Sequence, residues 1–377
     1  MARVKKKKMA IVSRLVSGVT GTTTTILEHN RRFVEEGWEV HVYGEKVAGG
    51  KIAAAGGEPH VMPRFPIGSF FKRRLFAWMF EREVRSEGFD LIRGHGDTLM
   101  QDVLCLHNCV HAAHEAVHGK RLGRTSGVGR IHSKMLHEQK FKLLIANSDL
   151  MRRDLVSRYG ISEGKIKVVH PGHDAHKFNA ETHDAGISVR QELGIAPKDV
   201  HIGLITSGDF QKRGVGLFLS ALRRLDEKIK RKLKILIIGQ ESRLGPYKNL
   251  AQQTGLGERI RFLAPEKDIW RYFHSLDIYV HPALFEEFGQ SVQEAMACGV
   301  PVLTSRRVGA SELLKGEAQR ILLEAPTESA LADSITRLVS EPAMRRAWAQ
   351  WCLAAARANT WDVNFKKHSR LYADLAV

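Results

Sequence analysis

Short apolar runs alternate with longer amphipathic stretches along nearly the whole chain. The apolar runs have the length of strands, and the stretches between them carry apolar residues at helical spacing. In the first half we expect strands at 9–14, 39–43, 90–93, 102–106, 143–146 and 167–169. In the second half we expect them at 202–206, 234–238, 261–263, 278–281, 302–304 and 320–322. Such alternation is typical of parallel sheets covered by helices.

Helix signals support the same organisation. A helix is expected at 22–36, another after Ser148 as its cap and ending near Tyr159, and a helical region from Thr327 onward. The segment 170–175 breaks the pattern as a linker would. With 377 residues, the chain is long enough for two domains. We therefore expect an α/β protein with two doubly wound halves, whose ligands bind at the carboxyl ends of the strands, in a cleft between the domains.

One segment carries the most specific chemistry. Glu286 and Glu294 lie eight positions apart, the first in a polar loop after an apolar strand and the second inside a helix that ends at Gly299. The helix start between them offers unpaired N–H groups and a positive dipole end, which favour an anion. Carboxylates on either side can accept hydrogen bonds from hydroxyls. A phosphate flanked by polyols, as in a nucleotide-sugar, fits this arrangement.

This segment resembles the E-x7-E motif of retaining GT-B glycosyltransferases, in particular family 4. Both glutamates match, as do the Phe288-Gly289 pair, the Glu-Ala-Met-Ala run at 294–297 and the Gly-x-Pro-Val run at 299–302. The resemblance implies a GT-B fold of two Rossmann-like domains facing a central cleft. It implies an acceptor-side domain at 1–172, a nucleotide-sugar domain at 173–357 and a last helix, 358–377, packed back on the first domain. An ordinary loop–helix–strand corner with solvated glutamates is the alternative.

The resemblance also implies roles for individual residues. Glu294 is expected to bind the ribose hydroxyls, and Glu286 the hydroxyls of the sugar. The diphosphate is expected at Lys212 and Arg213. Backbone amides are expected to complete the site at Phe288, Gly289, Gln290, Ser291 and Val292.

A basic loop follows the first strand of the second half. Lys212 and Arg213 stand directly before Gly214, where two cations can stabilise a departing diphosphate without a metal ion. The loop departs from the family pattern, because arginine precedes the glycine and Asp209 stands near a position where many members carry arginine. A solvated basic turn is the alternative.

The first strand is followed by a glycine-containing turn, 17–22. The resemblance implies that the amide of Gly21 lies near the donor phosphate, although the usual Gly-Gly pair is absent. A plain strand-to-helix turn is the alternative.

Histidines are frequent, with 18 in the chain. His107 follows an apolar strand, and in similar glycosyltransferases a polar residue there faces the donor sugar near the reacting carbon. His95, at a second strand end, is expected on the acceptor side; a structural histidine is the alternative for both. His114 and His118 form an H-E-x-x-H run with Glu115, which on a helix could hold zinc and predicts a metallohydrolase as a rival function.

The formal net charge of +17 predicts an anionic partner. No nucleic-acid-binding motif is present, so we expect no nucleic acid partner. The stretch 64–80 mixes aromatic residues with cations and could lie on an anionic membrane surface, or pack its rings into the first domain. No apolar run is long enough to span a bilayer, and the four cysteines lack a disulfide spacing. We expect a cytoplasmic protein that attaches peripherally to the inner face of the cell membrane.

Together these features predict a retaining, hexosyl-type glycosyltransferase that works without a metal ion. The expected donor is a UDP- or ADP-sugar, with no other cofactor. The local sequence around 207–210 and 102–118 resembles lipopolysaccharide core glycosyltransferases, which implies a lipopolysaccharide core or another lipid-linked glycan as the acceptor. The alternative from another class is a non-catalytic basic binding protein on the same fold.

Overall fold

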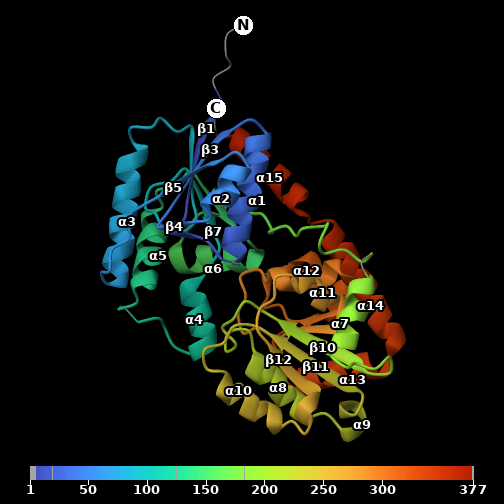
Figure 1. Cartoon of the computed structure of the whole chain (residues 1–377). Coiled ribbons are helices and arrows are strands. Elements are labelled where there is room, and N and C mark those ends of the chain that lie inside the picture. Colours follow the sequence, from blue (N-terminus) through green and yellow to red (C-terminus); the bar gives the residue numbers. More distant parts are fainter. Residues whose placement is uncertain (1–5, 19, 124, 182, 376–377) are drawn as a thin grey trace. The chain divides into compact units, whose positions relative to one another are not determined.

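The computed structural model describes residues 6–18, 20–123, 125–181 and 183–375, except the side chain of His183. The chain forms two compact units (Figure 1). Unit 1 comprises Met1–Pro171 and Asp362–Val377, and unit 2 comprises Gly172–Trp361. Each unit has its own parallel sheet covered by helices, the arrangement predicted from the alternating pattern.

Unit 1 is built on a seven-stranded sheet in the order β5-β3-β1-β6-β7-β8-β9. All of its neighbouring strands pair in parallel. The strands are β1 Lys8–Val12, β3 Glu39–Gly44, β5 Glu58–Val61, β6 Leu91–Gly94, β7 Val103–Leu106, β8 Leu143–Ala146 and β9 Ile166–Val168. Two short strands, β2 Leu15–Val16 and β4 Lys46–Val47, pair separately. Central strands such as β7 and β8 are buried along their whole length, which explains their unbroken apolar sequence.

The helices of unit 1 follow the strands in the expected order. They are α1 Gly21–Glu35, α2 Gly49–Ala54, α3 Ser69–Val84, α4 Val110–His118, α5 Gly127–Glu138, α6 Asp149–Tyr159, the 3₁₀ turn η1 Glu163–Lys165 and α15 Trp361–Ala373. The Ser148 cap predicted from sequence is confirmed, because its hydroxyl accepts a hydrogen bond from the Met151 N–H at 3.1 Å. No helix among the described residues has the length and apolarity needed to cross a membrane.

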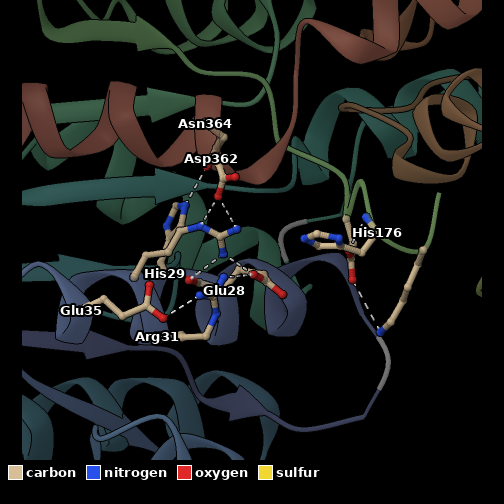
Figure 2. Close-up of polar contacts among 10 residues, drawn as sticks. Glu28, His29, Arg31, Glu35, His176, Asp362 and Asn364 are labelled. Carbon is tan, nitrogen blue, oxygen red and sulfur yellow. Dashed lines mark hydrogen bonds and ion pairs between the residues drawn. The ribbon is translucent and has the colours of Figure 1, made fainter. Parts of the chain in front are cut away.

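The last helix, α15, packs on α1 within unit 1. Figure 2 shows His29 on α1 facing Asn364 on α15, and the ring nitrogen lies 2.7 Å from the amide oxygen. Arg32 donates to Asp362 from two nitrogens, at 3.1 and 2.8 Å. The ring of Tyr372 on α15 also stacks on Phe33 of α1, with ring centroids 5.4 Å apart. The chain therefore returns to unit 1 after completing unit 2.

Unit 2 has a five-stranded parallel sheet in the order β12-β11-β10-β13-β14. The strands are β10 Val200–Ile205, β11 Leu233–Ile238, β12 Ile260–Leu263, β13 Ile278–His281 and β14 Val302–Thr304. The helices are α7 His183–Glu192, α8 Val215–Arg223, α9 Glu227–Lys230, α10 Leu244–Gln252, α11 Ile269–Ser275, α12 Gln290–Ala297, α13 Glu328–Ser340 and α14 Pro342–Arg357. Short 3₁₀ turns lie at η2 Gly257–Arg259, η3 Gly309–Leu313 and η4 Gly316–Ile321.

The strand expected at 320–322 is wrong. This region lies in and directly after the 3₁₀ turn η4, and Ile321 is buried in the core of unit 2. Its apolar character reflects packing against that core, since periodicity alone cannot separate a short strand from another buried segment.

The strand order of unit 2 changes direction between β10 and β13. The chain runs outward through β10, β11 and β12, and then returns to place β13 on the other side of β10. The loops after β10 and β13 therefore leave the same edge of the sheet side by side. In open α/β sheets this position is where ligands bind.

Candidate active site

The loops after β10 and β13 are joined by backbone contacts. The Leu284 N–H donates to the carbonyl of Lys212 at 2.9 Å. Gly214 has a φ of +71° and caps α8, and a Cβ at this position would collide with the carbonyl oxygen of Pro282. Only glycine fits such a close approach in the left-handed region. These contacts bring the basic loop against the segment that carries Glu286.

The two predicted cations are each paired with a carboxylate. Lys212 Nζ lies 2.7 Å from an oxygen of Glu287, and Arg213 contacts Glu286 directly. Both carboxylates are buried, while the cations are partly exposed. Sequence reasoning singled out Lys212, Arg213 and Glu286, but it missed Glu287, the carboxylate that pairs with Lys212.

The backbone of Glu286 is held on both sides. Its N–H donates to the carbonyl of Arg307 at 2.9 Å, and its carbonyl accepts from the Gly309 N–H at 3.0 Å. This short parallel bridge orients the side chain of a residue that lies in a loop. Glu286 thus lies in a loop, as predicted, but its backbone is hydrogen-bonded on both sides as in a strand.

His281 lies beneath Glu286 and was not singled out from the sequence. Its Nε2 is 3.6 Å from the Glu286 carboxylate, and its Nδ1 is 3.2 Å from the hydroxyl of Tyr279. Burial, with smaller effects of Arg213 and Lys212, lowers the pKa of His281 to about 3, so the ring is neutral. His281 is the last residue of β13, and this position at the carboxyl end of a strand could have marked it as a candidate site residue from the sequence.

Helix α12 begins between the two motif glutamates, as predicted. Gly289 is its cap, with a φ of +92°, and a Cβ there would approach Glu286 Cγ to 3.1 Å. Within the described part of the chain, the N–H groups of Gly289, Gln290 and Ser291 make no hydrogen bond. The helix start therefore offers several free donors beside Glu286, an arrangement suited to an anion.

Glu294 lies in the second turn of α12 and is only partly exposed. Burial raises the pKa of its carboxyl to about 7, with a smaller contribution from Asp174. A carboxylate that is costly to ionise alone is stabilised when hydroxyl groups donate hydrogen bonds to it.

The buried side of α12 is braced by residues that the sequence did not reveal. The amide nitrogen of Gln293 lies 2.8 Å from His173 Nδ1 and 2.6 Å from the carbonyl oxygen of Asn359. Asn359 donates back to Gln293 at 3.2 Å. This network fixes the helix whose start carries the free donors.

A polar cavity of about 540 Å³ opens beside the basic loop. It lies at the carboxyl ends of β10 and β11 and shares the loop that carries Lys212. Its lining comprises Asp209, Gln211, Gln240, Glu241, Ser242, Arg243, Pro246 and Tyr247. Unit 2 therefore has an open polar cavity beside the loop that carries its two cations.

Unit 1 holds the other predicted site residues. Gly21 is the exposed first residue of α1, after the Thr20 cap. His107 follows β7, and its Nε2 lies 2.7 Å from Nδ1 of His95 at the end of β6. Burial, and secondarily Arg93, lowers the pKa of His107 to about 3. The two strand-end histidines thus form one neutral, hydrogen-bonded pair.

The structure does not favour a metallohydrolase at the H-E-x-x-H run. Both oxygens of Glu115 accept hydrogen bonds from Arg158, at 3.0 and 2.8 Å, so its carboxylate is engaged in an ion pair. His107 lies outside α4, which begins at Val110. Among the described residues, no group of three metal-ligating side chains forms at this helix.

The basic and aromatic stretch 64–80 divides between core and surface. Phe76 and Phe80 are buried, while Phe71 and Trp78 are 68% and 55% exposed on α3. Arg73 is paired with Asp97 at 2.7 Å, so it is not an open surface cation. The helix α3 therefore has one face packed into the core of unit 1 and one exposed face.

The two parts of the chain each match a family of known proteins. The family model described as "Glycosyltransferase Family 4" matches residues 19–177, and that of "Glycosyl transferases group 1" matches residues 190–351. A D-inositol 3-phosphate glycosyltransferase of Corynebacterium jeikeium is 29% identical over 280 residues, which cover 71% of this chain and 66% of that protein. The chain thus spans just under two thirds of the length of this relative.

Two solved structures are similar in fold. WaaG, described as a glycosyltransferase involved in lipopolysaccharide biosynthesis, gives a TM-score of 0.82 at 18% identity, over 96% of this chain and 99% of WaaG. The Anabaena protein Alr3699/HepE in complex with UDP and glucose gives 0.76 at 19% identity, over 98% and 100% of the two chains. The chain has the GT-B fold and belongs to the group 1 glycosyltransferases.

Proposed function

We propose that this protein is a retaining, hexosyl-type glycosyltransferase that takes its sugar from a nucleotide-sugar. The observation that carries the proposal is the assembly, at one edge of unit 2, of Glu286, the cations Lys212 and Arg213, and the free amides that start α12. In this proposal the cations and the amides bind the diphosphate. Preorganised positive charge of this kind stabilises the leaving group as its charge develops.

Donor binding would exchange one set of partners for another. In the free protein, Arg213 and Lys212 contact the carboxylates of Glu286 and Glu287. A bound diphosphate would take over the cations, and Glu286 would then accept hydrogen bonds from sugar hydroxyls. The amides of Phe288 and Gly289 would orient the ring, and those of Gln290 and Ser291 would bind phosphate. The Val292 N–H, also expected there from the sequence, already donates to the carbonyl of Gly289 at 3.0 Å.

The proposal also assigns roles in unit 1. Gly21 would offer its amide to the donor phosphate, since it stands at the start of a fifteen-residue helix. His107 would contact the sugar as a neutral imidazole, in keeping with its low pKa. These assignments rest on the resemblance and on the exposed or strand-end positions of the two residues.

The donor can be identified by thermal shift and by turnover. We expect a matching UDP- or ADP-sugar at about 100 times its Kd to stabilise the protein by about 2.7 kcal/mol, or roughly 5–10 °C in Tm. UDP-glucose is the first candidate, because HepE binds UDP and glucose. Pyrophosphate serves as a control for simple attraction of anions to a basic protein.

Turnover separates an enzyme from a binding protein. With a suitable acceptor we expect nucleotide release and a product with the same anomeric configuration as the donor, read by NMR. Because Lys212 and Arg213 already supply positive charge, activity is expected to survive exhaustive chelation. Binding without turnover across donors and acceptors would favour the non-catalytic alternative, and an inverted product would refute retention.

Glu294 should make donor binding depend on pH. If ribose hydroxyls donate to its carboxylate, the donor binds the ionised form, whose population grows as pH rises through about 7. The affinity for UDP-glucose should therefore increase between pH 6 and 8, by at most about tenfold per unit below the pKa. Calorimetric titration would measure it. The variant E294Q should bind weakly and lose the dependence, whereas an unchanged slope would remove this role from Glu294.

We further propose a lipid-linked glycan, such as lipopolysaccharide core, as the acceptor, and an anionic membrane as the working surface. Along the outer face of α3, Phe71, Arg74, Trp78, Arg82 and Arg85 are all exposed at helical spacing. Phe65 and Ile67, just before the helix, are each 41% exposed. Aromatic rings with interleaved arginines suit a headgroup interface.

Flotation with lipid vesicles tests this surface. We expect the protein to float with anionic vesicles at low salt and to dissociate near 1 M salt, where the Debye length is about 3 Å. The double variant F71S/W78S should float less, while I187S, which removes an equally exposed apolar side chain (54%) in unit 2, should behave like the parent. Binding that ignores lipid charge or the double substitution would contradict a membrane role for α3.

A further inference from the structure

A cluster of metal-ligating side chains lies at the edge of the sheet in unit 1, and the proposed glycosyl transfer does not use it. His41 on β3 is buried, and Glu58 and His60 stand on the neighbouring edge strand β5. In the parallel register His41 lies opposite Glu58, and Tyr43 lies opposite His60. Alternation along each strand therefore puts all of these side chains on one face of the sheet. Among the described residues, this is the place where three such ligands meet.

We propose that His41, His60 and Glu58 form a binding site for a zinc-like divalent transition metal ion. His41 Nδ1 lies 2.8 Å from His60 Nε2 and 3.6 Å from a Glu58 oxygen, and His60 Nε2 lies 3.5 Å from the other oxygen. Tetrahedral zinc with ligands at about 2.0–2.1 Å keeps them about 3.4 Å apart. The three donor atoms are thus close to the spacing that one ion needs.

A second carboxylate orients the buried histidine. Glu39 Oε1 lies 2.9 Å from His41 Nε2, the ring nitrogen that faces away from the cluster. An ionised carboxylate only accepts hydrogen bonds, so Nε2 carries the proton and the lone pair of Nδ1 points to His60 and Glu58. Carboxylate-bound histidines of this kind are typical of protein zinc sites.

The ring of His60 is also positioned. It stacks on Tyr43 with centroids 4.3 Å apart and planes 10° apart. In the metal-free state, its Nε2–H donates to His41 Nδ1. Metal binding would require the other tautomer, with the proton on Nδ1 of His60, and this change can pass through solvent because His60 is partly exposed.

The local charge favours a cation although the whole chain carries +17. Glu39, Glu58, Glu83 and Glu87 all act on the groups of this cluster. The facing cations are Lys8, which is paired with Glu87 at 2.8 Å and lies 3.8 Å from Glu39, and Lys6, which acts on Glu39. The site therefore keeps net negative charge before the ion arrives. A bound ion would fasten the short edge strand β5, which contains Pro59, to β3.

Metal titration of the intact chain tests the site. After chelator treatment and dialysis, we expect one Zn²⁺ per chain in competition with a chromophoric chelator, and visible Co²⁺ absorption of four-coordinate type. The variants H60Q and E58Q, which change exposed or partly exposed residues, should bind at least about tenfold more weakly. E39Q should weaken binding about 10–100-fold without removing a ligand.

The matched control removes a different pair of histidines. His114 and His118 on α4 have ring centroids 4.4 Å apart, and H114Q should bind zinc like the parent protein. Zinc should raise the Tm of the parent and of H114Q but not of H60Q. If H60Q and E58Q retain the parent affinity and stoichiometry, or if H114Q alone loses them, the proposed site is wrong. None of these readouts depends on glycosyl transfer, so failure here leaves the proposed function standing.

Discussion

Replacing Glu286 by glutamine is expected to lower kcat for sugar transfer about 100–1,000-fold, the range measured when one preorganised polar group is removed from an active site. Glutamine keeps the size of the side chain but removes the charge that pairs with Arg213 and one strong acceptor for sugar hydroxyls. Because the phosphate donors of α12 remain, KM for the nucleotide-sugar should change less than kcat. Steady-state kinetics with the identified donor would measure both constants.

Two controls make this result specific. E324Q removes a carboxylate that is 84% exposed and paired with Arg306, so it changes charge equally without touching the site. UDP binding by E286Q shows that the nucleotide part of the site survives. A folded E286Q protein with parent kcat would refute the assignment of Glu286, whereas loss of UDP binding would point to collapse of the site around Arg213, which loses its carboxylate partner.

Replacing Gly214 by alanine is expected to damage both stability and activity. The left-handed backbone costs a residue with a Cβ about 1–2 kcal/mol. The collision with the Pro282 carbonyl should add about 1–3 kcal/mol, as for overpacked sites. Relief of the collision would move the basic loop away from Glu286. Displacements near 1 Å can cost about 100-fold in rate. Urea unfolding and initial rates would measure the two effects.

The chain offers a close control for this substitution. Gly194 has a φ of +65°, similar to that of Gly214, but a Cβ there would meet no atom within 4 Å. G194A should therefore show the backbone cost alone and keep full activity. Equal losses of stability in the two variants would mean that the contact with Pro282 does not hold the loops together.

Several features could be predicted from sequence because they depend on neighbours along the chain. The alternation of apolar runs and amphipathic stretches predicted the parallel sheets, and Ser148 marked the start of α6. The spacing of Glu286 and Glu294 predicted a helix start between two carboxylates, which α12 provides. The error at 320–322 arose where a buried residue in a 3₁₀ turn looked like part of a strand.

The partners of these residues could not be predicted in the same way. Lys212 and Glu287 are 75 positions apart, and no local pattern distinguishes Glu287 from Glu286 as the partner of the lysine. Gln293, His173 and Asn359 come from three distant segments and meet only behind α12. The pairing of β3 with β5 likewise decides that His41 and His60 touch.

The sequence by itself determined the fold class and the local positions of the motif carboxylates and cations, at strand ends and beside a helix start. Local spacing is enough for these, because helix and strand periodicity and turn chemistry act over a few residues. Only the tertiary structure decided which carboxylate faces which cation, which histidines are neutral and buried, and which face of α3 is exposed. These properties follow from long-range packing and from the loss of solvent around each group, which residue spacing alone does not encode.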